Sequence, residues 1–271
     1  MILQKIKYLY VNFKSIRNAL IFNRKHSIKV ILNDEEFKLL KILKTKGFVV
    51  VENYYTKEQC DELITEVDRL LIDYPQFTWK DDFGADKRIY GANRISTLID
   101  KYYSDPFLTK MANAFNEMET INNHTLAGKI EAKENNIGSG QGWHRDSVNP
   151  YQFKSILYLS DVDIDHGPFE FLEGTDKIRS IFEGIWNVGT KPKQYRITTE
   201  IIDKFVKSDK YKRKILTGKA GTLILVNTFG IHRGMPINKG VRFALTNYFF
   251  SKMGLNETYF ENKFNLPPIQ N

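Results

Sequence analysis

Two residues of the segment Gly142–Asp146 could bind a metal ion together. Successive side chains of an extended segment point to opposite faces, so His144 and Asp146 share one face and Arg145 takes the other. An imidazole nitrogen and a carboxylate oxygen would then lie near one point, and both are common metal ligands. Because a histidine and an aspartate at this spacing also occur by chance, a third ligand is needed to define a site.

The other four histidines differ in how well they could supply that ligand. His26 lies in a basic N-terminal segment, and His124 follows two asparagines. His166 stands in a turn that ends at Pro168. His232 follows an apolar run and a short turn, where the end of a strand would present it. We therefore predict His232 as the third ligand.

Arg242 stands ten residues after His232 and opens the apolar segment 243–250. A guanidinium that enters a buried strand costs free energy unless it meets an anion, and a carboxylate suits its planar fork. Two histidines and one carboxylate form the facial triad of non-haem iron(II) oxygenases, which leaves positions open for a cosubstrate and dioxygen. A 2-oxo acid could chelate the metal there and place its far carboxylate on Arg242.

Helices dominate the first half of the predicted structure. Asn33 with Glu36 and Thr56 with Gln59 are capping-box signatures, which mark helix starts. The predicted elements are helices over 33–46, 56–73 and 106–118, a short buried strand over 48–51, and a long polar loop over 80–104.

From about residue 121, short β-type runs alternate with turns, which is typical of an antiparallel sandwich or barrel. Residues 175–219 interrupt the runs as a long insertion with a helix near 199–208, and such insertions often carry binding surface. We predict one α+β domain over 33–271 with its β-rich core at about 121–250. The expected strands are 126–132, 153–160, 168–172, 220–227 and 241–250.

Residues 1–32 form a basic amphipathic leader that contains no acidic residue, since the first one in the chain is Asp34. Two interpretations stay open: contact of residues 1–27 with an anionic membrane or a partner, or docking of a helix on the protein's own core. The apolar residues at helical spacing are Ile2, Ile6, Leu9, Phe13, Ile16 and Leu20.

Composition narrows the class of protein. The chain has 271 residues, 42% of them apolar, and a net charge of +8, so it can bury a core and attract anions. The single Cys60 excludes an internal disulfide and cysteine-based metal clusters, and we expect it in the core. Without a long apolar run or a signal-peptide pattern, we expect a cytoplasmic protein, peripheral to the membrane if the leader binds lipid. No zinc finger, helix-turn-helix or dense basic stripe indicates a nucleic-acid partner.

The sequence resembles the phytanoyl-CoA dioxygenase family of Fe(II)/2-oxoglutarate oxygenases over about 120–250. The resemblance rests on Gly142–Asp146, on the turns 167–169 and 173–175, and on the pair His232 and Arg242. It implies a double-stranded β-helix (a jelly-roll, cupin-like barrel) with N-terminal helices packed outside.

The resemblance also implies an activity and its residues. Fe(II) would bind His144, Asp146 and His232, and 2-oxoglutarate would bind Arg242, with Tyr158 as a further hydrogen-bond partner. The enzyme would hydroxylate an aliphatic C–H of a small or medium metabolite with O2, and 2-oxoglutarate would become succinate and CO2.

Three positions depart from the family pattern. His166 replaces the asparagine of an Asn-Gly-Pro turn, and the segment 173–176 replaces Pro-Gly-Ser-His. Arg145 stands between the first two ligands, where it would alter substrate contacts. None of these changes removes a ligand, and the presence of Asp146 disfavours the halogenase variant, which lacks the carboxylate.

Two other functions remain as alternatives: a non-catalytic jelly-roll module that binds a ligand and keeps a metal site, and a cupin-like enzyme that uses another divalent metal without a 2-oxo acid. Trp143 is expected in the core or in the wall of the site, and Asn227 near the turn before His232. A basic mouth would favour an anionic or a lipid- or glycan-linked substrate. Its predicted residues are Arg88, Arg94, Lys133, Arg145 and Lys191.

Overall fold

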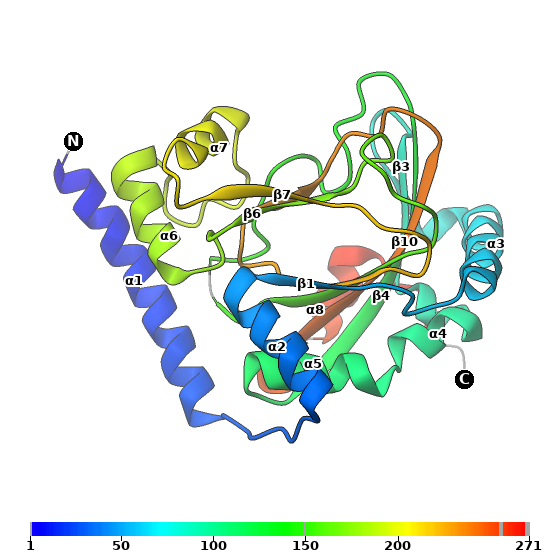
Figure 1. Ribbon diagram of the computed structural model, residues 1–271, viewed down its shortest axis with the longest axis horizontal. Helices are drawn as coiled ribbons and strands as arrows, with labels where there is room; N and C mark the ends of the chain where they lie inside the picture. Colours follow the sequence, from blue (N-terminus) through cyan, green and yellow to red (C-terminus); the bar gives the residue numbers. More distant parts are fainter. Residues whose placement is uncertain (1, 149, 255–256, 269–271) are drawn as a thin grey trace.

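Two antiparallel sheets form the β-rich half of the chain (Figure 1). The structure is a computed structural model that describes residues 2–148, 150–254 and 257–268. The larger sheet has the strand order β1-β8-β5-β10-β4-β3-β2, and the smaller sheet has the order β7-β6-β9. After β5 the chain crosses between the two sheets four times, as in the predicted jelly roll, and the helices lie outside.

The strands agree with the predicted runs and add four more. The larger sheet contains β1 (Phe48–Val51), β2 (Thr78–Lys80), β3 (Asp86–Tyr90), β4 (Thr120–Glu131), β5 (Phe153–Tyr158), β8 (Leu223–Asn227) and β10 (Val241–Ser251). The smaller sheet contains β6 (Phe169–Glu173), β7 (Lys212–Leu216) and β9 (His232–Gly234).

The alternation of side chains along β10 separates the core from the interior of the barrel. Leu245 and Phe249 pack into the main hydrophobic core beneath the helices. Arg242 and Tyr248, an even number of residues apart, line the cavity between the sheets. A strand places alternate residues on opposite faces, so one apolar-looking run serves both surfaces.

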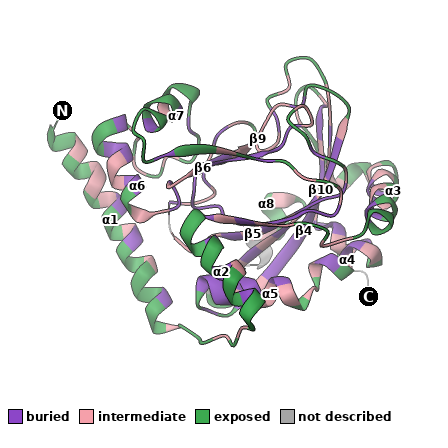
Figure 2. Ribbon diagram, in the orientation of Figure 1, coloured by how far each residue is buried: buried purple, intermediate pink, exposed green. Residues whose placement is uncertain are grey.

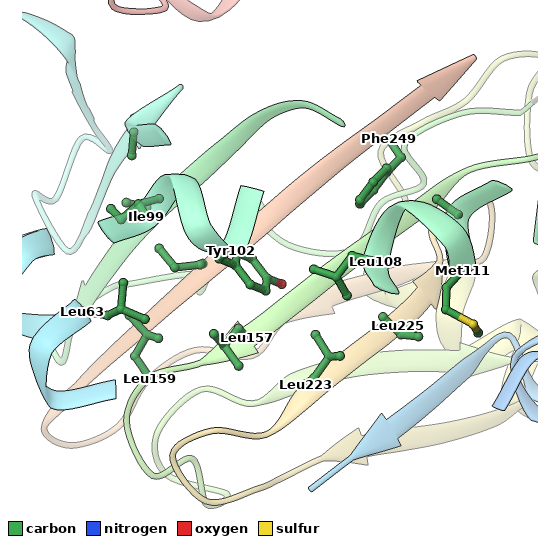
Figure 3. Packing of buried hydrophobic residues seen from close by; sticks show 14 of the residues in the cluster. Leu63, Ile99, Tyr102, Leu108, Met111, Leu157, Leu159, Leu223, Leu225 and Phe249 are labelled. Atoms are coloured by element: carbon green, nitrogen blue, oxygen red, sulfur yellow. The ribbon is translucent and has the colours of Figure 1, made fainter. Parts of the chain in front are cut away.

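Four helices cover the outer face of the larger sheet. The two capping boxes predicted at Asn33 and Thr56 are present. The helix that begins after Asn33 ends at Gly47, which adopts the left-handed conformation. Figure 3 shows leucines of β5 and β8 packed against side chains of these helices. The helices are α2 (Asp34–Lys46), α3 (Lys57–Asp73), α4 (Thr97–Tyr103) and α5 (Pro106–Asn116).

The prediction of a loop over 80–104 is wrong. Strand β3 pairs with β4 through this segment, and α4 follows after a short 3-10 turn, Ala92–Arg94. Asp86 and Arg88 of β3 point into the cavity, so the strand lacks the apolar alternation that marks a half-buried strand. Because the inward-facing residues of β3 are polar, its sequence has the composition of a loop.

The insertion between β6 and β7 is largely helical. Its elements are α6 (Ile178–Glu183), the π-helix η3 (Gly184–Val188) and α7 (Thr199–Val206), the last close to its predicted place. At the ends of the chain lie α1 (Ile2–Lys25) and α8 (Glu257–Phe264). Two further 3-10 turns are Pro75–Phe77 and Lys252–Gly254.

Helix α1 packs along α6 and η3 at one edge of the molecule (Figures 1 and 2). The side that faces the body is narrow: Asn12, Ile16 and Asn23 are its buried residues. The Asn12 side chain accepts a hydrogen bond from the backbone N–H of Lys193 in the insertion. Within the described residues, no helix is both long enough and apolar enough to cross a bilayer.

Candidate metal centre

His144 and His232 lie directly opposite each other on neighbouring extended segments. The N–H of each residue donates to the carbonyl oxygen of the other, both at 2.9 Å, so they form an antiparallel hydrogen-bonded pair. Their side chains therefore share a face, and their ring centroids are 4.3 Å apart. Residues distant in sequence are thus brought together by two backbone hydrogen bonds.

Asp146 completes the predicted cluster. Its Oδ1 lies 3.8 Å from Nε2 of His144 and 4.0 Å from Nε2 of His232. The N–H of Asp146 donates to the carbonyl of Thr228, which fixes the segment beyond His144. The ligand atoms of the three residues all lie within 4.8 Å of one another, a spacing that one metal ion can bridge.

Both histidines hold the ring form that a metal requires. Nδ1 of His144 donates to Gly142 O, and Nδ1 of His232 donates to Gly230 O, both at 2.9 Å. Nε2 of each ring is then the atom with a free lone pair. Burial lowers the pKa of both rings, that of His232 to about 3. The two imidazoles are therefore neutral, and the lone pair on each Nε2 faces the side of Asp146 and is free to bind a metal.

Gly140 leaves the space that the His144 ring occupies. Its φ is +79°, and an added Cβ would lie too close to Cε1 of His144. We expect Gly140→Ala to cost about 1–2 kcal/mol of stability for the left-handed backbone and to displace the imidazole, which weakens metal binding. Calorimetric titration with Ni(II) measures the second effect. Gly189→Ala, at φ +93° with no atom within 4 Å of the added Cβ, is the control, and equal metal affinity in both variants would contradict the prediction.

Lys154 of β5 holds the other oxygen of the Asp146 carboxylate. Its Nζ lies 2.7 Å from Oδ2 and 4.1 Å from the centre of the Tyr248 ring. Burial alone would raise the pKa of Asp146, but the positive charge of Lys154 lowers it below its usual value. The carboxylate is therefore ionised, with Oδ1 left toward the histidines. No sequence motif marks Lys154, because only the pairing of β5 within the sheet brings this lysine to Asp146.

We expect Lys154→Met to destabilise the metal-free protein more than the metal-loaded protein. Without Lys154, a largely buried carboxylate lacks a counter-charge, which we expect to cost about 1–2 kcal/mol after discounting for partial exposure. A bound cation replaces that counter-charge. Thermal unfolding with and without Ni(II) measures the difference, and Lys57→Met, which breaks an exposed pair with Asp61, is the control. An equal loss in both states would contradict the prediction.

Arg242 lines the same cavity, which has a volume of about 350 Å³. Its side chain is 7% exposed, and burial lowers the pKa of its guanidinium. In the described part of the chain, no residue forms a hydrogen bond or ion pair with this guanidinium. By contrast, nearby Arg88 is bound to Asp86 through two of its nitrogens. Within the described residues, Arg242 is thus a buried cation that no carboxylate contacts; Asp86 acts on its charge without contact and is itself paired with Arg88.

Tyr158 also lines the cavity, but its hydroxyl group is already bonded. The hydroxyl donates to Leu216 O at 2.9 Å and accepts from the Phe169 N–H at 2.8 Å. To donate to 2-oxoglutarate it would have to give up the bond to Leu216. Its contact with the cosubstrate therefore stays a prediction, while its hydrogen bonds tie β5 to the smaller sheet.

The remaining histidines lie away from the cluster. His124 is fully buried and stacks on Tyr248 at 4.6 Å between ring centroids. His166 bonds Asp163 in its turn, and His26 lies against Phe22 at the end of α1. None of these three lines the cavity among the described residues.

Three other residues singled out in the sequence have supporting places. Trp143 is buried in the core, and the guanidinium groups of Arg213 and Arg233 both contact its ring. Asn227 accepts from the Phe229 N–H and so shapes the turn before His232. Cys60 is fully buried, as expected.

The predicted basic mouth agrees with the cavity only in part, because Arg88 and Arg145 line it and the other three predicted residues do not. Arg145 donates to Thr175 O and Phe229 O and braces loops behind the site. Lys133, Lys191 and Arg94 do not line the cavity within the described residues, and Arg88 is paired with Asp86. Lys154, Arg196 and Lys263 line it instead.

A profile of the phytanoyl-CoA dioxygenase (PhyH) family matches residues 43–243. No curated protein matches the chain significantly. Among solved structures, the non-heme alpha ketoglutarate dependent carbocyclase SnoK from nogalamycin biosynthesis has a TM-score of 0.62 at 11% identity, over 88% of this chain and 92% of its own.

Two further structures have a similar likeness. The epimerase SnoN in complex with Fe3+, alpha ketoglutarate and nogalamycin RO has a TM-score of 0.62 at 15% identity, over 80% of this chain and 84% of its own. EctD from S. alaskensis with bound Fe has a TM-score of 0.62 at 14% identity, over 83% of this chain and 80% of its own. At these identities the likeness shows a shared fold.

The jelly roll and the cluster of two imidazoles and one carboxylate define a protein of the non-haem oxygenase class. With the family match over the larger part of its length, the chain belongs to the phytanoyl-CoA dioxygenase family. The resemblance inferred from the sequence is therefore confirmed. The protein is an Fe(II)/2-oxoglutarate-dependent enzyme, with Fe(II) as its metal and 2-oxoglutarate and O2 as its cosubstrates.

Proposed function

We propose that this enzyme hydroxylates an aliphatic C–H of a small or medium metabolite and converts 2-oxoglutarate to succinate and CO2. His144, Asp146 and His232 bind Fe(II) in this proposal, and Arg242 binds 2-oxoglutarate. The observation that carries it is the buried guanidinium of Arg242, which no carboxylate contacts within the described residues and which lines the cavity that the three ligands share. A buried cation of this kind is stabilised when a carboxylate enters.

Each residue has a distinct task in this reaction. When bound, Fe(II) supplies the chemistry that activates O2. The neutral imidazoles and Asp146 Oδ1 would hold the metal, while Lys154 pairs with Oδ2. The planar fork of Arg242 would bind the far carboxylate of 2-oxoglutarate in two parallel hydrogen bonds and so set its orientation.

The fit of the residues to Fe(II) rests on the donor set and on the ring orientation. Both Nε2 atoms and one carboxylate oxygen converge, which is the ligand set that leaves positions open on non-haem iron. The similar structures support the same cofactors, because SnoN is in complex with Fe3+ and alpha ketoglutarate and EctD has bound Fe. They also include an epimerase and a carbocyclase, so the hydroxylation needs its own test.

Turnover of 2-oxoglutarate is the first test. Protein is loaded anaerobically with Fe(II) and 2-oxoglutarate, exposed to O2 with a metabolite panel, and assayed for succinate. We expect succinate from the wild-type protein and none from His144→Ala. With 18O2, mass spectrometry should find one labelled oxygen in the hydroxylated metabolite, because the other oxygen atom enters succinate. Absence of succinate across the panel would favour the non-catalytic binding module, and a metabolite product without labelled oxygen would overturn hydroxylation.

We also propose that α1 places the enzyme at the cytoplasmic face of an anionic membrane. The α1 face opposite Asn12 and Ile16 is exposed, and Arg17 and Arg24 lie among its apolar side chains. An apolar face with basic residues binds anionic lipid by burial and by charge. The exposed apolar residues of α1 on this face are Ile2, Leu3, Ile6, Tyr10, Phe13, Leu20 and Ile21.

Vesicle co-sedimentation of the full-length chain tests this contact. We expect binding to vesicles of phosphatidylglycerol and phosphatidylcholine, and a loss of binding in the double variant Ile6→Asp with Phe13→Asp. Phe37→Asp, on the exposed face of α2, is the control for the loss of one exposed aromatic ring. Equal binding of all proteins would overturn the proposal.

A further inference from the structure

We propose that Arg196 binds an anionic group of the substrate, a phosphate or a carboxylate, at the mouth of the cavity. This inference rests on the proposed function, because it assumes that the cavity beside the metal ligands receives the substrate. Arg196 lies in the insertion between α6 and α7, outside the motifs that identify the metal site.

Backbone pairing places Arg196 next to His144. The Arg145 N–H donates to Tyr195 O, and the Ile197 N–H donates to Trp143 O, both at 2.9 Å. His144 and Arg196 are thus opposite each other in an antiparallel bridge, as a pair without direct backbone hydrogen bonds. In such pairs the side chains share a face, with Cβ atoms about 4.5–5.5 Å apart.

Arg196 therefore continues the row of the metal ligands. His232 flanks His144 on one side, and Arg196 flanks it on the other. A group bound to the Arg196 guanidinium would lie beside the metal, where a substrate must lie to react.

The guanidinium of Arg196 has only neutral partners in the described structure. It donates to Gly140 O and Gln141 O, and its other terminal nitrogen reaches the Gln141 side-chain oxygen at 3.4 Å. Lys154, in contrast, is paired with a carboxylate of the cavity. Arg196 thus keeps an uncompensated charge at the exposed end of the cavity, as Arg242 does at the buried end.

The cavity as a whole has an excess of positive charge. Apart from Arg145, which is bonded elsewhere, five cationic side chains and two carboxylates line it. Fe(II) and 2-oxoglutarate carry opposite double charges, so loading both leaves this excess unchanged. A site of this sign concentrates anions. The lining charged residues are Arg88, Lys154, Arg196, Arg242 and Lys263 with Asp86 and Asp146.

Aromatic side chains near Arg196 indicate what the anion is attached to. Tyr195, Tyr248 and Phe264 line the same cavity, and aromatic faces pack well against apolar or ring-shaped bodies. A substrate with an apolar or cyclic body and one anionic group fits these walls. The guanidinium fork can bind either phosphate or carboxylate through two hydrogen bonds.

The experiment uses protein loaded with Ni(II), which does not turn over, and with saturating 2-oxoglutarate, which occupies Arg242. Phenyl phosphate, phenylacetate and neutral benzyl alcohol are titrated by calorimetry. We expect one of the two anions to bind more tightly than benzyl alcohol, and the preferred anion identifies the group. In Arg196→Gln its affinity should fall about tenfold or more, as for the loss of a charge-assisted hydrogen bond.

Two variants make the measurement specific. Arg196→Lys keeps the charge without the planar fork, so we expect an intermediate loss. Arg179→Gln removes an exposed arginine of α6 outside the cavity and should change nothing. The inference is overturned if Arg196→Gln binds the anions as the wild type does, or if no anion binds better than benzyl alcohol. A separate titration of the Ni(II)-loaded protein with 2-oxoglutarate distinguishes failure of this inference from failure of the proposed function. Only a lack of 2-oxoglutarate binding would contradict the proposed function.

Discussion

Asp146→Ala should abolish succinate formation and weaken Fe(II) binding by more than about 100-fold. Residues that only orient a metal ligand typically contribute about 10–100-fold to affinity or activity, and Asp146 is itself one of the three proposed ligands. It is also the only carboxylate within reach of both Nε2 atoms among the described residues. The measurements are calorimetric titration with the metal and anaerobic loading followed by a succinate assay.

A second aspartate in contact with a histidine gives the matched control for Asp146. Asp163 Oδ1 lies 2.6 Å from Nδ1 of His166 in an exposed turn, and Asp163→Ala should leave metal binding and turnover unchanged. Because Asp146→Ala also leaves Lys154 without its carboxylate, circular dichroism must first show that the variant is folded. Turnover retained by a folded Asp146→Ala protein would refute the assignment of the centre.

Arg242→Met should raise the KM for 2-oxoglutarate by about 100-fold or more without loss of stability. Two hydrogen bonds between charged groups contribute about 1.5–3 kcal/mol each, or about 3–6 kcal/mol together, which corresponds to about 100- to 10⁴-fold in affinity. In the absence of 2-oxoglutarate, methionine replaces a buried guanidinium that has no partner, so the free energy of unfolding should stay the same or rise.

Arg88 and Arg242, which both line the cavity, should respond in opposite ways. Arg88 is bound to Asp86 inside the barrel, and Arg88→Met would leave that carboxylate buried without a counter-charge. We expect Arg88→Met to lower the free energy of unfolding by about 3 kcal/mol, measured by urea denaturation beside Arg242→Met. If Arg242→Met proved equally destabilising, Arg242 would have a structural partner and would not be held ready for a cosubstrate.

The parts of the site that the sequence predicted are those that local rules determine. His144 and Asp146 share a face because a strand has a period of two, and His232 follows a strand that is apolar throughout. The capping boxes at Asn33 and Thr56 depend on residues three positions apart. Local patterns of this kind can be recognised in the sequence without knowledge of the three-dimensional structure.

The parts that the sequence did not predict depend on pairing across long distances. Arg196 lies beside His144 only because the segments 195–197 and 143–145 pair, and no periodicity in the insertion encodes that register. Lys133 and Lys191 are nearby in sequence to site segments but do not line the cavity. Sequence proximity to a motif was therefore a poor guide to the charged wall.

Tyr158 illustrates the same limit for a residue whose strand was correctly predicted. Its inward direction follows from the alternation along β5, but its hydroxyl partners belong to β6 and β7. In strand β3 the sequence failed to predict the strand itself. Its inward-facing residues line a polar cavity, so the segment shows no alternation of apolar and polar residues. In both cases the smaller sheet or the cavity, and not the local segment, decides the chemistry.

The bonds from Nδ1 of His144 and His232 end on carbonyl groups of the main chain, and every residue type carries such a carbonyl. Point mutations around the centre therefore cannot delete these acceptors, provided that the backbone keeps its path. The side chains that line the cavity can therefore change during evolution while both imidazole rings keep their orientation. An ancestor with this arrangement could give rise to descendants that oxidise different compounds without having to reinvent the oxidising centre.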